Sequence, residues 1–161
     1  MRDVPLPAYA GDTGDADPDV RAALAAVTAE PPTYLAAVAE LCLARLLVPI
    51  MAVSTSRGED GADQTSEMAM ALLNSDDGSA LLAFTGLDAL AAWRSDARPS
   101  PVTLDQAARV ARDAGADRVL VDVAGPTPLI IEQPILGQLA DGHRLVRIGA
   151  MGEYGWLRPA R

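Results

Sequence analysis

The chain has 161 residues, of which 50% are hydrophobic and only 4% aromatic, and its formal net charge is −9 at pH 7. A chain of this length corresponds to one domain that can bury a core without the help of a metal or a disulfide. The negative charge argues against nucleic acid and against an anionic membrane surface as partners, because both require clustered basic side chains.

The ends and the cysteine content point to a compartment. A single cysteine, Cys42, excludes an internal disulfide and suits a reducing environment. The N-terminus lacks the basic region and apolar core of a signal peptide, and no apolar run approaches the roughly 20 residues that a membrane span needs. We therefore expect a cytoplasmic protein.

The first third of the chain predicts an arm followed by two helices. Residues 1–16 show no hydrophobic periodicity, and we expect them to form a flexible arm. Asp17-Pro18 places an N-cap residue before a proline at the first helical position, which predicts a helix that runs to Ala29. We expect Glu30-Pro31-Pro32 to end this helix and Thr33 to begin the next one.

A strand and a long loop follow the helical pair. Leu46 to Val53 is an apolar run that predicts a strand, and Pro49 within it marks an edge or a bulge because proline cannot donate to a ladder. Residues 54–66 are polar and acidic. They predict a long surface loop that, with the N-terminal arm, is the most mobile part of the chain.

The stretch from Glu67 to Trp93 predicts a strand, a tight turn, a second strand and a helix. Met68 to Leu73 is uniformly apolar, as in a strand buried on both faces. Asp77-Gly78 supplies a hairpin turn, and Ala80 to Phe84 returns as an antiparallel strand. Thr85 is the expected N-cap of a helix. The apolar face of this helix would carry Leu87, Leu90 and Ala91.

Thr103 begins the most clearly defined helix of the chain. Gln106 three residues later completes a capping box, and Gly115 is the expected residue beyond the C-terminus. Before this helix, Pro101 to Thr103 is expected to add a short edge strand.

The last third predicts a second hairpin, a short helix and an end segment. Arg118 to Val123 and Pro128 to Glu132 are the expected strands. A short helix then begins at Pro134 and is closed by Gly142. Residues 143–161 are expected to be a C-terminal tail, either a last strand with a docked end or a flexible segment.

Together these elements predict a single α/β domain, with α+β as the alternative. Its mixed sheet would be built from two β-hairpins plus an edge strand and packed by helices. We expect this domain to span residues 17–142, including the N-terminal helical pair, between the arm of residues 1–16 and the tail of residues 143–161.

Four segments resemble the SseB N-terminal domain family in its actinobacterial form. They are LLVPIMAV at Leu46 to Val53, the strand start Glu67-Met68, LLAFTGLDALAAW at Leu81 to Trp93, and VDVAGP at Val121 to Pro126. The resemblance covers the chain from about Tyr34 to Gly142. It implies a mixed α/β domain and no established activity, so it assigns no catalytic residue.

The residue inventory excludes several chemistries. His143 is the only histidine, and neither it nor Cys42 has the sequence neighbours of a nucleophile and base. One cysteine and one histidine cannot build a zinc site of the usual composition. We therefore expect no catalytic residue, no cofactor and no metal.

Three residues remain as a candidate interaction surface: Trp93, Asp122 and Glu132. Asp122 lies within an expected strand, so it must either accept hydrogen bonds at the following turn or form a polar point in a groove. Trp93 is either a lid on the core or an exposed anchor for a partner.

The leading hypothesis is a non-enzymatic protein that binds another protein. One alternative is a small-molecule-binding domain or enzyme with a pocket near Asp122, Glu132 and Trp93. A second alternative is a structural homodimer that pairs through an exposed sheet edge near Pro49 or Val102.

Overall fold

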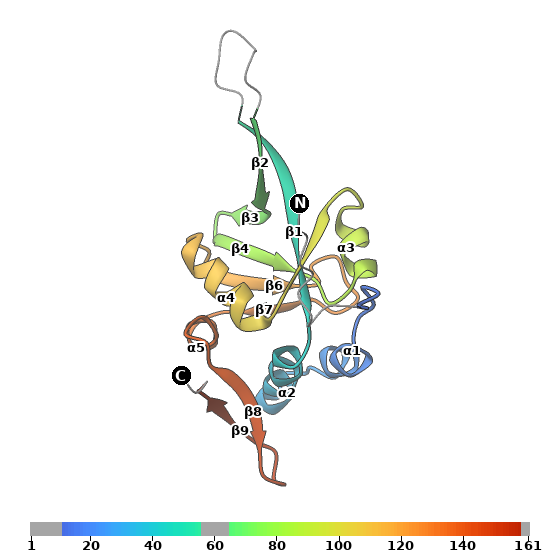
Figure 1. The fold of residues 1–161 in the computed structure, drawn as a ribbon. Helices are drawn as coiled ribbons and strands as arrows, with labels where there is room; N and C mark the ends of the chain where they lie inside the picture. The colour runs from blue at the N-terminus through green and yellow to red at the C-terminus, as the bar shows by residue number, and fades with distance from the viewer. Residues whose placement is uncertain (1–10, 56–64, 159–161) are drawn as a thin grey trace.

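The computed structural model describes residues 11–55 and 65–158, which form an α/β domain (Figure 1). Most of the expected arm and of the expected loop, residues 1–10 and 56–64, lies outside the described residues. The helices are α1 (Pro18–Ala25), α2 (Pro31–Cys42), α3 (Leu87–Trp93), α4 (Leu104–Asp113) and α5 (Ile135–Ala140). The strands are β1 (Leu46–Thr55), β2 (Thr65–Met70), β3 (Leu72–Ser75), β4 (Gly78–Ala83), β5 (Arg98–Val102), β6 (Arg118–Val121), β7 (Leu129–Ile131), β8 (Arg144–Ile148) and β9 (Glu153–Leu157).

A four-stranded mixed sheet lies at the centre, in the order β3-β4-β6-β7. Its two antiparallel hairpins are joined by the parallel pair β4–β6, which needs the long crossover through α3, β5 and α4. The helix α4 packs against β4 and β6. The expected fold, a mixed sheet of two hairpins packed by helices, is thus confirmed.

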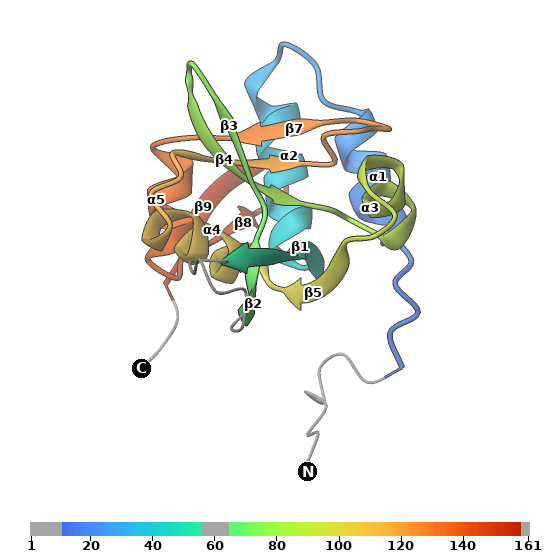
Figure 2. The same ribbon diagram turned by 90° about the horizontal axis from the view of Figure 1, so that it is seen from above.

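A second sheet has the order β2-β1-β5 and touches the first at one point. The N–H and C=O of Leu47 in β1 bond the C=O and N–H of Phe84, each at 2.8 Å. Figure 2 shows β1 and β5 side by side at one edge of the molecule, with α1 and α3 together at another. Arg21 of α1 and Asp88 of α3 form an ion pair there at 2.7 Å.

Pro49, which was expected to mark an edge or a bulge, is not at a sheet edge but buried in the central strand β1. The ladder between β1 and β2 ends at the pair Ile50–Met70, and the C=O of Pro49 then accepts from the N–H of Ala71 at 3.0 Å. Pro49 has no N–H with which to complete this pair, and the neighbouring strand leaves the sheet at the same point.

The outer edge of β5 is protected by two prolines. Leu47 directs its hydrogen bonds away from β5, so the opposite residue, Pro101, belongs to a non-hydrogen-bonded pair, as does Pro99 opposite Pro49. The nitrogens of both prolines face outward. A strand that approached the edge near Val102, as in the homodimer alternative, would find no N–H at these two residues.

The apolar run Met68–Leu73 is two strands, not the single fully buried one expected. The chain pairs with β1 up to Met70, breaks at Ala71 and then pairs with β4 from Leu72. Met70 is 36% exposed and Leu73 43% exposed. The change of partner sheet brings these side chains to the surface, which an apolar run alone does not reveal.

The two N-terminal helices have other boundaries than expected. The helix α1 ends at Ala25 instead of Ala29, and α2 begins at Pro31 instead of Thr33. Prolines at the first helical residues lose no hydrogen bond, so they open α2 instead of closing α1. Thr33 does not begin the helix. Its hydroxyl instead accepts a hydrogen bond from the N–H of Thr28, in the connection before α2, at 2.9 Å.

The first and last described segments both pack against the rest of the domain. The expected tail forms the hairpin β8–β9, whose Leu145 is buried and whose Tyr154 and Trp156 pack against the core. The described part of the expected arm, residues 11–16, lies on α3, where the C=O of Gly14 accepts from the N–H of Leu87 at 2.8 Å.

A small hydrophobic cluster joins the two sheets to α3. Phe84 is fully buried among Leu47, Leu82, Ala89 and Leu90. Trp93, at the end of α3, is partly buried on this cluster and stacks on Phe84 with ring centroids 5.7 Å apart. This arrangement matches the reading of Trp93 as a lid. The prediction that Leu87 lies on the apolar face of α3 is wrong, because Leu87 is 42% exposed and Ala89 is buried instead.

We predict that Phe84→Ala lowers the free energy of unfolding by about 3–5 kcal/mol, because the side chains packed around the ring relax only partly into the space it leaves. Trp93→Ala should cost less, because its ring is partly exposed. Urea unfolding measures both, with Leu73→Ala as a surface control. A Phe84→Ala protein with the midpoint and slope of the wild type would contradict the prediction.

Candidate functional site

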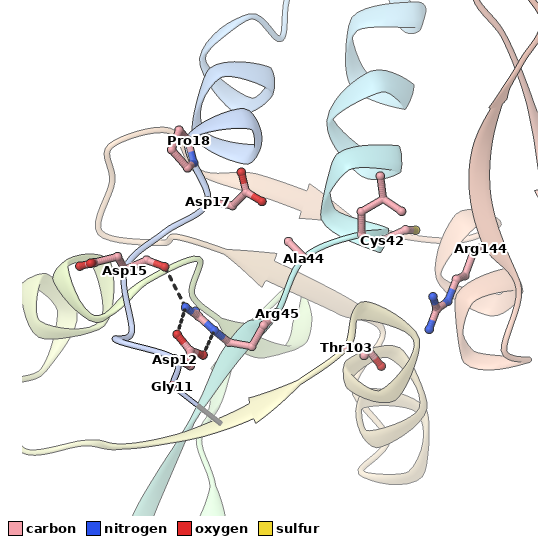
Figure 3. Close-up of a pocket in the computed structure, with 11 residues that line it drawn as sticks. Gly11, Asp12, Asp15, Asp17, Pro18, Cys42, Ala44, Arg45, Thr103 and Arg144 are labelled. Carbon is pink, nitrogen blue, oxygen red and sulfur yellow. Dashed lines mark hydrogen bonds and ion pairs between the residues drawn. The ribbon is translucent and has the colours of Figure 1, made fainter. Parts of the chain in front are cut away.

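A cavity with a volume of about 660 Å³ lies where four segments meet. These are the segment before α1, the connection from α2 to β1, the beginning of α4 and the beginning of β8. Figure 3 shows Asp15 and Asp17 on one side of this polar cavity and Arg144 on the other. Its walls therefore carry opposite charges.

Arg45, in the floor of the polar cavity, donates four hydrogen bonds. Its guanidinium donates to both carboxylate oxygens of Asp12 at 2.7 and 3.0 Å, and to the C=O of Asp15 at 2.8 Å. A further bond reaches the C=O of Thr85 at 3.0 Å. The bonds from Arg45 hold the pKa of Asp12 below its ordinary value. Arg45 thus clamps the segment before α1.

The opposite wall holds Thr103 and Arg144. The Thr103 hydroxyl accepts from the N–H of Gln106, and the Gln106 side chain accepts from the N–H of Thr103, so the expected capping box of α4 is confirmed. Within the described residues, the ion pair of the Arg144 side chain is a long contact of 3.9 Å with Asp105. This side chain is therefore available to interact with an incoming group.

Cys42 lies in the same cavity wall, but its environment does not favour a nucleophile. Burial raises the pKa of its thiol, which keeps the sulfur protonated near neutral pH. The His143 side chain forms a hydrogen bond with the side chain of Gln138, with Nδ1 2.5 Å from Oε1.

A second cavity of about 360 Å³ lies between α1, α2 and the hairpin β8–β9. Its walls are mostly small and apolar, with Tyr154 at one side. Asp19 and Glu40 on the helices and Arg147 on β8 add charged groups. The small side chains that make it hollow are Ala22, Ala23, Ala36 and Ala39.

Leu43 lines both cavities and is 76% exposed. It follows the last residue of α2 and stands between the polar cavity and the alanine-lined cavity. We call Leu43, together with the residues of both cavities, the Leu43 face. Sequence reasoning missed it, although the alanine-rich stretches within residues 18–42 are a signal of a shallow helical surface.

Asp122 is not on any surface, contrary to the groove interpretation. Its side chain is 0% exposed, and its backbone leaves the strand with a φ of 52°. Its carboxylate accepts from the N–H of Thr85 at 2.8 Å and from the Thr85 hydroxyl at 2.7 Å. The Thr85 hydroxyl in turn accepts from Nε of Arg21 at 2.8 Å.

This contact also corrects the expected helix start. Thr85 does not cap α3, because its hydroxyl is committed to Asp122, and Gly86 is the N-cap residue. At the turn after β6 the backbone C=O of Asp122 accepts from the N–H of Gly125 at 2.9 Å, but the carboxylate, which was expected to bond there, takes its donors from the neighbouring strand end. Burial raises the pKa of Asp122 above its ordinary value.

The three candidate residues are not brought together. Trp93 stacks on Phe84, Asp122 is buried, and Glu132 is exposed just after β7. The charge of Glu132 affects one other group: burial and, to a lesser degree, Glu132 raise the pKa of Tyr34 to about 12. None of the three lines either cavity of the Leu43 face.

Within residues 11–55 and 65–158, no three His, Cys, Asp or Glu side chains are arranged to hold a metal ion. No helix in the same ranges combines the length and the apolarity needed to cross a membrane.

Comparison with known proteins identifies one family. The model of the SseB protein N-terminal domain matches residues 20–138, which is most of the chain. No curated protein and no solved structure matches. The matched range includes α2 and Leu43, whereas the acidic residues before Val20 and the hairpin β8–β9 lie outside it.

We predict that Asp122→Ala destabilises the protein by about 3 kcal/mol, because it leaves the N–H and hydroxyl of Thr85 buried without an acceptor. Asp122→Asn should cost less, since asparagine keeps one acceptor oxygen and tolerates a positive φ. Urea unfolding checks both, with Asp113→Ala, at an exposed aspartate of α4, as a control. Equal stability of the alanine variant and the wild type would contradict this role.

The stability difference between wild type and Asp122→Asn should also depend on pH. Because the folded pKa of Asp122 is raised, the native state holds this proton more tightly than the unfolded chain, whose pKa is about 3.9. The advantage of the wild type is therefore greatest below this pKa and shrinks as pH rises through the folded pKa. Unfolding curves at a series of pH values measure it, and a difference that grows with pH would overturn the assignment.

Proposed function

The chain belongs to the SseB protein N-terminal domain family, and from this premise we propose that it is a non-enzymatic interaction domain that binds another protein through the Leu43 face. The observation that carries the proposal is the exposure of Leu43, 76%, between two cavities. Single exposed leucines are common on protein surfaces. One that stands between two hollows offers a partner both a contact and room for its own side chains.

The shape of the face supports binding to a protein. Interfaces depend on a few large side chains that enter well-packed pockets on the other partner. Covering an exposed leucine contributes about 2 kcal/mol. The alanine-lined cavity beside Leu43 can receive a side chain of the partner in return, so the two surfaces would interlock.

The groups that line the polar cavity support binding more than catalysis. Arg45 is held by four hydrogen bonds, and the Cys42 thiol has a raised pKa. Nucleophilic catalysis needs a nucleophile within hydrogen-bond reach of a base. Should a reaction be found, Cys42→Ser and His143→Ala are expected to leave its rate nearly intact.

The proposal predicts that Leu43→Asp weakens partner binding by about tenfold or more, because the variant loses apolar contact and adds a desolvated charge. Leu73→Asp is the matched control, since Leu73 is an exposed leucine of β3 outside the Leu43 face. Quantitative mass spectrometry compares what the wild type and both variants retain from an extract. Proteins kept by the wild type and by Leu73→Asp but lost by Leu43→Asp are the expected result.

The opposite pattern refutes the proposal. If Leu43→Asp retains the same proteins as the wild type while its thermal unfolding is unchanged, binding does not pass through this face.

A further inference from the structure

The acidic and basic groups of the Leu43 face lie on opposite sides of it. Asp17 and Asp19 belong to the start of α1, and Glu40 lies on α2, whereas Arg144 and Arg147 both belong to β8. Among the described residues, neither Asp19 nor Glu40 takes part in an ion pair. The helical side of the alanine-lined cavity therefore carries two negative charges that no neighbouring side chain neutralises.

The size of this cavity indicates what it can hold. Its volume of about 360 Å³ is at the lower end of the range of small-molecule sites. It has apolar walls and lies beside an exposed leucine, as an anchor pocket for one large side chain would. A leucine, phenylalanine or tryptophan side chain of a partner fits this description.

We infer that the partner presents a short basic segment that carries one large apolar residue. The apolar side chain enters the alanine-lined cavity beside Leu43, and a neighbouring lysine or arginine pairs with Glu40 and Asp19. This inference rests on the proposed function and specifies the chemistry of its partner. The net charge of −9 adds a long-range attraction for a basic segment.

A second copy of the chain is a poor occupant of the same face. Each copy carries a net charge of −9, so two copies repel one another at long range, whereas a basic segment is attracted. Like charges across an interface are destabilising. The charge distribution thus favours a different, basic partner.

The test is a selection of random twelve-residue peptides on the immobilised wild-type protein, with removal of peptides that also bind Leu43→Asp. The expected peptides carry arginine or lysine within a few residues of leucine, phenylalanine or tryptophan. Glu40→Arg should weaken a selected peptide by about fivefold, as for a partly exposed charge pair, and added salt should weaken it too.

A matched pair of variants tests the cavity itself. Ala39→Leu fills the cavity and should reduce binding of the selected peptide by about tenfold. Ala25→Leu, at the exposed end of α1, should leave it unchanged. Thermal unfolding of both variants checks that the fold is retained.

The outcomes separate the two proposals. Peptides that depend on Leu43 but are neutral or acidic would overturn the basic partner and keep the face. An absence of Leu43-dependent peptides, together with unchanged protein capture by Leu43→Asp, would overturn both. A dimer that sedimentation detects in the wild type and not in Leu43→Asp would replace the basic segment with a second copy.

Discussion

The buried carboxylate of Asp122 is the constraint on which the rest of the structure depends. It ends β6, and its two hydrogen bonds to Thr85 hold the end of the parallel neighbour β4 beside it. Arg21 of α1 reaches the same threonine hydroxyl and also pairs with Asp88 of α3. One buried charge thus positions two strand ends and two helices, and its removal would leave several polar groups without partners.

The shape of the Leu43 face depends on the same hydrogen-bond network, through Thr85. The C=O of Thr85 accepts from Arg45, which also clamps Asp12 and the C=O of Asp15 in the segment before α1. This segment is one wall of the polar cavity. The other walls follow from α2, which packs on α1 and on β8. The surface that we propose to bind a partner is therefore positioned by the hydrogen-bond network beneath it.

The edge of β5 and the Leu43 face differ in what they offer to another chain. The edge of β5 exposes Pro99 and Pro101, which offer no N–H to an incoming strand. The Leu43 face, in contrast, combines a hollow, an exposed leucine and uncompensated acidic groups. In our proposal, the acidic groups on its helical side, Asp19 and Glu40, favour a basic protein segment. The arrangement therefore supports selection among partners by charge and anchoring by an apolar side chain.

The sequence by itself determined the elements whose signals are local. Asp77-Gly78 specifies a hairpin and Thr103 with Gln106 specifies a helix start, because these bonds join residues only a few places apart. The tertiary structure alone decided that Thr85 serves Asp122, 37 residues away, instead of capping α3. It also separated Trp93, Asp122 and Glu132 and assembled the Leu43 face from α1, α2 and β8. Periodicity reports which residues share a face of one element, but it carries no information on which distant element will meet that face.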